Sequence, residues 1–197
     1  MNILIVSGSQ RKRSMSFEVS LYIQDKLTQY FDGIEASVLN LSDYPYLLDH
    51  YGEHKNDKEK LASEKESVLK QMYACDAVVI VAPEWGGMLP PALVNLLLLS
   101  ANGSAGGLPF GHKPAFAVGV SASGGGSNPI SQLKGYTAKN SHLVWLPLYA
   151  VIQNVETFLT TQWQPGEGDR YTQIQSRLLV GLNSLVIYAR QLVGVRE

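Results

Sequence analysis

Three continuous apolar runs constrain the fold of this chain more than any other feature. They occupy residues 3–6, 77–82 and 115–120 and contain only aliphatic residues, phenylalanine and glycine. Strands that are covered on both faces show such runs, because neither face meets water. We therefore predict three central strands of a parallel sheet. A more alternating segment at 34–41 is expected to form a strand nearer an edge, and a fifth strand is expected within residues 143–155.

Segments with helical spacing separate these strands. Apolar side chains recur every three or four residues in the first of them, two adjacent prolines open another helix that runs to residue 99, and a long helix is expected near the C-terminus. The residues that mark these helices are Val19, Ile23, Leu27, Tyr30, Pro90, Pro91, Ile174, Leu178, Leu182, Leu185 and Ala189. Residues 58–72, within the most charged part of the chain, are expected to form a solvated helix. Strands alternating with helices predict a three-layer, doubly wound α/β sandwich, with residues 1–197 forming a single domain.

Composition excludes several classes of protein. The formal net charge is −1, which argues against nucleic acid or an anionic membrane surface as the main partner. The longest apolar stretch, residues 92–99, is far shorter than the roughly 20 residues of a membrane-spanning helix. Cys75 is the single cysteine, which excludes an internal disulfide, a four-cysteine zinc site and a cysteine-ligated iron–sulfur cluster. We expect a protein of the reducing cytoplasm without nucleic-acid or membrane partners.

The loop after the first strand has the composition of a phosphate site. In doubly wound sheets, ligands bind beyond the carboxyl ends of the strands. Gly8 permits a tight turn there, Ser9 and its neighbouring serines offer hydroxyls, and Arg11 offers a fork of donors in front of a helix N-terminus. An ordinary helix-capping loop with incidental basic residues is the alternative. The dinucleotide fingerprint G-x-G-x-x-G is absent, and residues 111–114 lack the Ser or Thr of a P-loop.

Two further loops are expected to reach the same crevice. The loop at 83–91 places Trp85 beside Gly86 and Gly87, which allows backbone amides to approach a flat heteroaromatic ring. A bland loop around a buried tryptophan is the alternative. The loop at 121–129 is rich in glycine and can offer several N–H donors. Each loop is weak evidence alone, but three at neighbouring strand ends predict one binding site.

These loops resemble those of the NAD(P)H-dependent FMN reductase family of flavodoxin-like proteins, which includes quinone, azo-dye and chromate reductases. The resemblance rests on four segments and covers residues 1–133. The segments are Gly8-Ser9-x-Arg11-x-x-Ser14, Leu41-Ser42-Asp43-Tyr44-Pro45, residues 76–85 with their Pro-Glu-aromatic ending, and residues 113–126. The resemblance implies a flavodoxin-like α/β/α sandwich whose five parallel strands lie in the order 2-1-3-4-5.

The resemblance also assigns cofactor-binding roles to individual residues. The FMN phosphate is expected to be held by Ser9, Arg11, Ser14, Met15 and Ser16. The isoalloxazine ring is expected to be lined by Pro83, Glu84, Trp85, Gly86 and Gly87. Near the pyrimidine edge of the ring we expect Ser121, Ser123 and Gly124. The chain departs from the family at Trp85, where Tyr is usual, and at Gly86, where Asn is usual. Backbone contacts tolerate both changes, whereas side-chain contacts and access to the ring are expected to differ.

The resemblance implies an FMN-dependent oxidoreductase. A reduced nicotinamide, NADPH or NADH, passes hydride to flavin N5, and the electrons then go to FMN, a quinone, an azo compound or another small acceptor. No catalytic side chain and no metal are expected, and His50 and His54 are assigned to a solvated loop. Two alternatives stay open: an FMN-binding electron carrier or redox-responsive protein without nicotinamide oxidation, and a phosphate-binding or interaction module that has lost the cofactor.

Low charge outside residues 53–70 predicts a buried surface between subunits. Ten of the 33 charged residues lie in that one segment. Aromatic residues expected to be exposed, namely Trp145, Tyr149, Phe158 and Trp163, suggest that residues 145–164 take part. We expect a homodimer or homotetramer, in agreement with the family resemblance.

Overall fold

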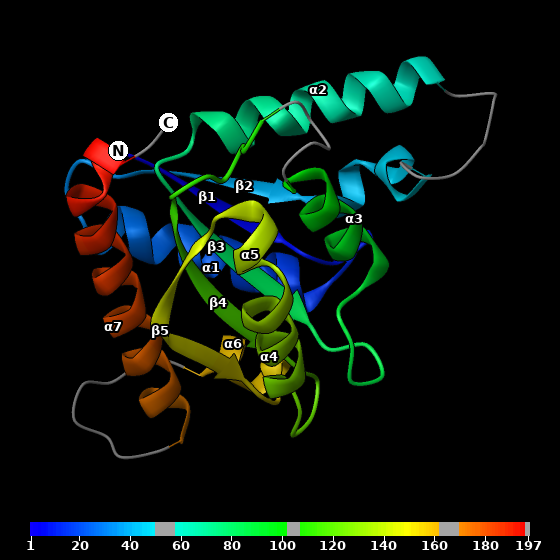
Figure 1. Ribbon diagram of the computed structural model, residues 1–197. Helices are drawn as coiled ribbons and strands as arrows, with labels where there is room; N and C mark the ends of the chain where they lie inside the picture. The colour runs from blue at the N-terminus through cyan, green and yellow to red at the C-terminus, as the bar shows by residue number, and fades with distance from the viewer. Residues whose placement is uncertain (50–57, 102–106, 162–169, 196–197) are drawn as a thin grey trace.

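The computed structural model describes residues 1–49, 58–101, 107–161 and 170–195, and its centre is a five-stranded parallel sheet (Figure 1). The strands are β1 (Asn2–Ser7), β2 (Glu35–Asn40), β3 (Ala77–Pro83), β4 (Pro114–Val120) and β5 (Val144–Ile152). Their order is β2-β1-β3-β4-β5, which confirms the expected flavodoxin-like topology.

Helices cover both faces of the sheet. They are α1 (Met15–Tyr30), α2 (Lys58–Ala74), α3 (Pro91–Leu99), α4 (Ser127–Tyr136), α5 (Ala138–Ser141), α6 (Val155–Thr160) and α7 (Arg170–Gln191), joined by short 3₁₀ segments at Leu41–Asp43, Pro45–Asp49 and Val193–Val195. The apolar side chains of α2, α3 and α4 pack on one face, and those of α1, α6 and α7 pack on the other. The predicted three-layer sandwich is therefore confirmed.

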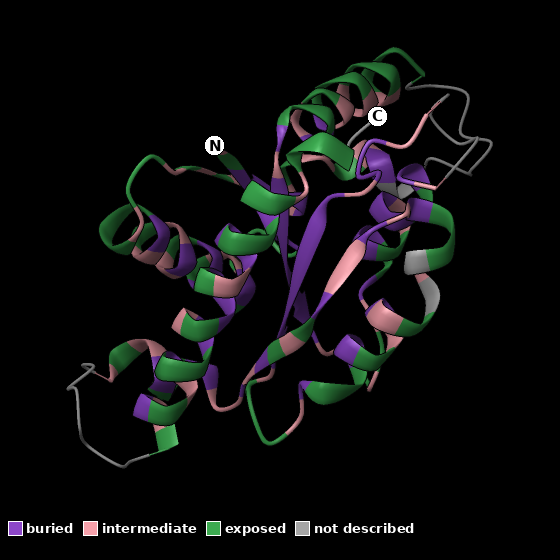
Figure 2. Cartoon of the chain, turned by 60° about the vertical axis from the view of Figure 1, so that its left-hand side comes forward, coloured by how far each residue is buried: buried purple, intermediate pink, exposed green. Residues whose placement is uncertain are grey.

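The three apolar runs form the centre of the sheet. Every residue of β3 and β4 is buried, and β1 is buried from Ile3 onward (Figure 2). Leu4 and Val6 face the α2–α3–α4 layer, whereas Ile3 and Ile5 face the α1–α7 layer. This two-sided burial explains why the runs lack polar alternation.

The fifth strand lies within the expected residues 143–155 and contains a proline, Pro147. Pro147 has no N–H to donate to the neighbouring strand, and the pairing of β4 with β5 shifts between Ala115 and Ala117, which face Trp145 and Tyr149. Because β5 is an edge strand and Pro147 is exposed, the missing ladder hydrogen bond costs little there.

The aromatic residues of this region are less exposed than predicted. Phe158 is completely buried, and its ring centroid lies 5.3 Å from that of Tyr22 in the α1–α7 layer, so the expectation of exposure was wrong for it. Trp145 is half-buried and donates its Nε1–H to Thr137 Oγ1 over 2.9 Å. Tyr149 is exposed, whereas Trp163 lies outside the described residues, as do His50 and His54.

Candidate functional site

The loops after β1, β3 and β4 meet at one pocket of about 560 Å³ beyond the carboxyl ends of these strands. Ten of the thirteen predicted site residues line it: Ser9, Arg11, Ser14, Met15, Ser16, Pro83, Glu84, Trp85, Gly86 and Ser121. Gly87, Ser123 and Gly124 flank the pocket without lining it. The structure therefore brings together most of the residues that the sequence had placed on three separate loops.

The first wall of the pocket is the start of α1. Ser14 caps the helix, since its Oγ accepts a hydrogen bond of 3.3 Å from Phe17 N–H. Ser9 Oγ accepts one of 3.2 Å from Arg11 N–H, which shapes the preceding loop. Among the described residues, no acceptor is found for the N–H groups of Met15 and Ser16. Two free N–H groups at the positive end of a helix have the geometry to receive an anion.

Polar atoms also lie under this loop. Ser7, the last residue of β1, is completely buried, and its Oγ has no hydrogen-bond partner among the described residues. Asn40 is its register partner on β2, and the Oδ1 of this asparagine is unpartnered in the same way. Buried polar atoms are normally satisfied by protein, water or a bound group. The base of the loop thus has hydrogen-bonding capacity that a polar ligand or a water molecule would use.

The second wall is a tight turn after β3. Trp85 and Met88 exchange two backbone hydrogen bonds of 3.0 Å, and Gly86 and Gly87 between them have φ of 57° and 81°. Two successive left-handed residues favour glycine and also tolerate asparagine. The substitution of glycine for the usual asparagine at position 86 therefore preserves the shape of the turn.

The third wall is the loop after β4, which folds back over its own strand. Gly119 makes this possible, because a Cβ atom there would lie 1.9 Å from the carbonyl oxygen of Gly126. Ser121 lines the pocket, and its Oγ accepts a 3.2 Å hydrogen bond from Ser123 N–H. Ser123 and Gly124 are exposed, and the Gly124 carbonyl accepts a hydrogen bond from the side chain of Gln153.

Side chains tie the three loops to one another. Gln10 Oε1 accepts a 3.1 Å hydrogen bond from Ala92 N–H at the start of α3. A carboxylate oxygen of Glu84 accepts a hydrogen bond from Gly126 N–H, and Gln132 on α4 bonds to the turn after β3. Neither glutamine is recognisable as a site residue from the sequence, because a polar residue in a loop or on a helix predicts only solvent exposure.

The pocket carries charges of both signs. Arg11 and Arg13 line it, as do Glu84 and Glu156. Arg13 is not among the site residues predicted from the sequence, yet it lines the pocket. In the part of the chain that the structure describes, no group of three or more His, Cys, Asp or Glu side chains could hold a metal ion.

The segment at 111–114 lies at the other end of the sheet. It precedes β4, and the ammonium group of Lys113 donates to the carbonyl oxygens of Met72 and Tyr73 over 2.6 and 2.8 Å. This lysine is a helix-capping residue of α2 and not a phosphate ligand, which confirms that the segment is no P-loop.

Fold and site together define a flavodoxin-like α/β protein in which a helix start with free N–H groups and a glycine turn meet at one pocket. The sequence profile of the family described as NADPH-dependent FMN reductase matches residues 1–157. The chain belongs to this family and is an NAD(P)H-dependent flavin oxidoreductase with FMN as its flavin. Comparison with curated protein sequences gives no significant match.

Solved structures share the fold at low sequence identity. The apo form of the NADH:FMN oxidoreductase EMOB superposes with a TM-score of 0.67 and 13% identity, covering 97% of this chain and 89% of that one. FerB from Paracoccus denitrificans, an NAD(P)H:(acceptor) oxidoreductase, gives 0.64 and 19%, with 97% and 98% covered. RosB with bound 8-demethyl-8-formylriboflavin-5'-phosphate gives 0.65 and 19%, with 98% and 80% covered. Among the described residues, no helix is long and apolar enough to cross a membrane.

Proposed function

We propose that the 560 Å³ pocket binds FMN, with the phosphate at the start of α1 and the isoalloxazine ring against the turn after β3. The observation that carries this assignment is the combination, in one pocket, of free N–H groups at Met15 and Ser16 with a left-handed turn at Gly86. The first suits a phosphate dianion, and the second exposes backbone to a flat ring.

Each wall has a distinct part in this assignment. The phosphate is held by the residues of the first wall, namely Ser9, Arg11, Ser14, Met15 and Ser16. The wall along the ring consists of Pro83, Glu84, Trp85, Gly86 and Gly87. Toward the polar edge of the ring lie Ser121, Ser123 and Gly124. The N–H group of Gly124 has no acceptor among the described residues, which leaves it available to a carbonyl oxygen of the ring.

When bound, FMN would supply the chemistry of hydride and electron transfer between NADPH or NADH and an acceptor. The protein binds the phosphate, orients the ring and leaves one face open to small molecules. Glu84 holds Gly126 N–H and is a positioning residue in this scheme, not a general base. We infer that the acceptor is a small planar molecule such as free FMN, a quinone or an azo compound, because FMN, general-acceptor and azo reductases share the fold.

The visible absorption spectrum tests the proposal. Purified protein is titrated with FMN, the titration is repeated with Arg11→Ala, and NADPH is then added without oxygen. Perturbed flavin bands that the substitution weakens and NADPH bleaches are the expected result. Binding without bleaching would favour an electron carrier, and no binding by the unaltered protein would contradict the assignment.

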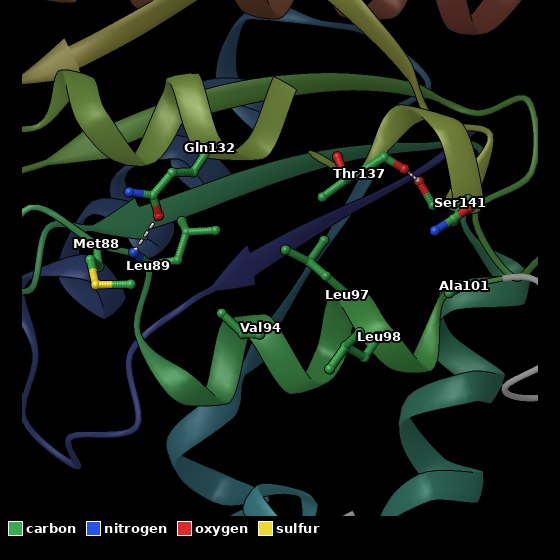
Figure 3. A pocket seen from close by; sticks show the side chains of 10 residues that line it. Met88, Leu89, Val94, Leu97, Leu98, Ala101, Gln132, Thr137 and Ser141 are labelled. Atoms are coloured by element: carbon green, nitrogen blue, oxygen red, sulfur yellow. Dashed lines mark hydrogen bonds between the residues drawn. The ribbon is translucent and has the colours of Figure 1, made fainter. Parts of the chain in front are cut away.

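We further propose a homodimer that uses the outer face of α3. Val94 and Leu98 on this face are 39% and 43% exposed, and Met88 in the turn before the helix is 63% exposed. All three border an apolar pocket of about 410 Å³ (Figure 3). No charged residue occurs in α3, so this face buries without desolvating an ion. It replaces residues 145–164 as the proposed subunit contact, because Phe158 is buried within its own chain.

Sedimentation velocity tests the location of this contact. Leu98→Glu is expected to give a monomer, whereas Leu21→Glu, at an exposed apolar position on α1, is expected to leave the dimer intact. A dimer that survives Leu98→Glu would place the contact elsewhere. Cys75 is the single cysteine and is buried, so no disulfide can form within the chain, which supports the cytoplasm as the proposed compartment.

A further inference from the structure

We propose that Gln132 is a positioning residue that presets the turn at 85–88 for the flavin ring. The side-chain amide uses both of its polar atoms on this turn: Nε2–H donates to the Gly87 carbonyl over 2.9 Å, and Oε1 accepts from Leu89 N–H over 3.0 Å. The inference rests on the proposed place of FMN in the adjoining pocket. Neither the family motifs nor the residues assigned from the sequence include Gln132.

The turn needs an external support because its own sequence provides little rigidity. Gly86 and Gly87 lack side chains that could pack, and Gly86 has open space where a Cβ would stand. Two backbone hydrogen bonds between Trp85 and Met88 close the turn. Glycine has more conformational freedom to lose than any other residue, so an unsupported glycine pair would have to be ordered by the cofactor itself.

Gln132 stands on a part of the chain that is itself fixed. Its neighbours on α4, Ile130 and Leu133, are buried in the core at 3% and 0% exposure. The residue just before α4, Gly126, donates its N–H to Glu84 at the start of the turn segment. The two ends of the segment 84–89 are therefore both anchored to residues 126–132, and the turn is held as a bridge between these anchors.

The amide approaches the turn from the side away from the proposed cofactor. Met88, Leu89 and Gln132 line the 410 Å³ pocket between α3 and α4 (Figure 3). Trp85 and Gly86 instead line the 560 Å³ pocket. Gln132 thus forms hydrogen bonds with the Gly87 carbonyl and the Leu89 N–H, while the N–H of Gly86 has no acceptor among the described residues. This arrangement keeps one backbone donor available on the cofactor side.

Substitution of Gln132 tests the inference in the full-length protein. We expect Gln132→Leu to weaken FMN binding about tenfold, as measured by flavin fluorescence, which corresponds to about 1.4 kcal/mol. Riboflavin, which lacks the phosphate, is expected to lose the same factor because the defect lies at the ring. Ser131→Ala on the same helix, whose hydroxyl bonds only to Ser127 O over 3.5 Å, is the matched control and is expected to bind FMN normally.

The conservative variant Gln132→Glu separates positioning from a general loss of structure. Its carboxylate can accept from Leu89 N–H but cannot donate to the Gly87 carbonyl, whereas its protonated form can do both. We therefore expect the riboflavin affinity of Gln132→Glu, relative to the unaltered protein, to recover as the pH falls toward about 4.3. Gln132→Leu is expected to show no such recovery.

The outcomes distinguish this inference from the proposed function. Parallel pH profiles for the two variants, or unchanged flavin affinity in Gln132→Leu, would overturn the positioning role of Gln132. Failure of the unaltered protein to bind FMN would instead overturn the proposed site. Recovery of riboflavin binding in Gln132→Glu alone supports the inference, because riboflavin carries no phosphate that could repel the carboxylate.

Discussion

The guanidinium carbon of Arg11 lies 4.6 Å from the centroid of the Trp85 ring. The contact joins the first loop of the pocket to the third-strand turn, and both residues line the pocket. A cation over an indole at an exposed site is worth about 0.5–1 kcal/mol. A phosphate group can outcompete this contact, because its charge-assisted hydrogen bonds are worth about 1.5–3 kcal/mol each. The guanidinium group of Arg11 can therefore exchange its contact with Trp85 for hydrogen bonds to a phosphate at a small cost in free energy.

Replacing Arg11 is expected to affect FMN more than riboflavin. Arg11→Met keeps much of the side-chain length and removes the charge, so we expect about tenfold weaker FMN binding. The expected loss is no larger than this because Arg11 is exposed and solvent screens its charge. Riboflavin affinity is expected to change less than twofold. Flavin fluorescence titrations measure both. Lys12→Met, at an exposed neighbour that does not line the pocket, is the control, and equal losses for both flavins would contradict the phosphate role.

Substitutions of Glu84 distinguish loop positioning from proton transfer. Glu84→Gln keeps an oxygen that accepts from Gly126 N–H, so FMN affinity and kcat are expected to stay within about threefold of normal. Glu84→Ala leaves the Gly126 N–H without its acceptor and is expected to weaken FMN binding about tenfold. Steady-state oxidation of NADPH checks the first expectation. A loss of kcat by two orders of magnitude in Glu84→Gln would instead assign acid–base chemistry to the carboxylate.

The sequence predicts this fold well because the signals for it are local. The buried runs of β1, β3 and β4 fix the centre of the sheet, and the prolines at 90 and 91 mark the start of α3. The loop proposed to bind phosphate is recognisable for the same reason, since its serines, Arg11 and the following helix are adjacent in the chain. Each feature depends on residues within one short segment.

Long-range contacts could not be predicted from such signals. Gln10 meets the start of α3 across 82 positions, and Gln132 meets Leu89 across 43. A glutamine carries no pattern that identifies its partner, so its role depends on the finished fold. Phe158 was misjudged for a related reason: its burial depends on Tyr22 of α1, a helix distant in the chain.

Lys113 is expected to stabilise the protein without affecting the site. It is 6% exposed, and it satisfies the last carbonyl groups of α2 through Met72 and Tyr73. Lys113→Met leaves those carbonyls unpaired, so we expect a loss of about 2 kcal/mol in the free energy of unfolding. Urea denaturation measures this loss, with Lys70→Met on the exposed side of α2 as the control. FMN affinity is expected to be unchanged, because Lys113 lies at the opposite end of β4.

Titration of Glu64 on α2 is expected to lower the free energy of unfolding as the pH rises from the unfolded pKa of this carboxyl group to its higher folded pKa. Burial raises the pKa of Glu64 above its usual 4.5, although its carboxylate accepts a 3.1 Å hydrogen bond from Leu47 N–H. Between the unfolded pKa and the raised folded pKa, the folded chain keeps a proton that the unfolded chain has released. The free energy of unfolding therefore decreases with rising pH through this window. Glu64→Gln retains an oxygen for Leu47 N–H and removes the titration, so its melting temperature relative to that of the unaltered protein is expected to rise from pH 4 to pH 7. A constant difference across that range would show that Glu64 titrates normally in the folded chain.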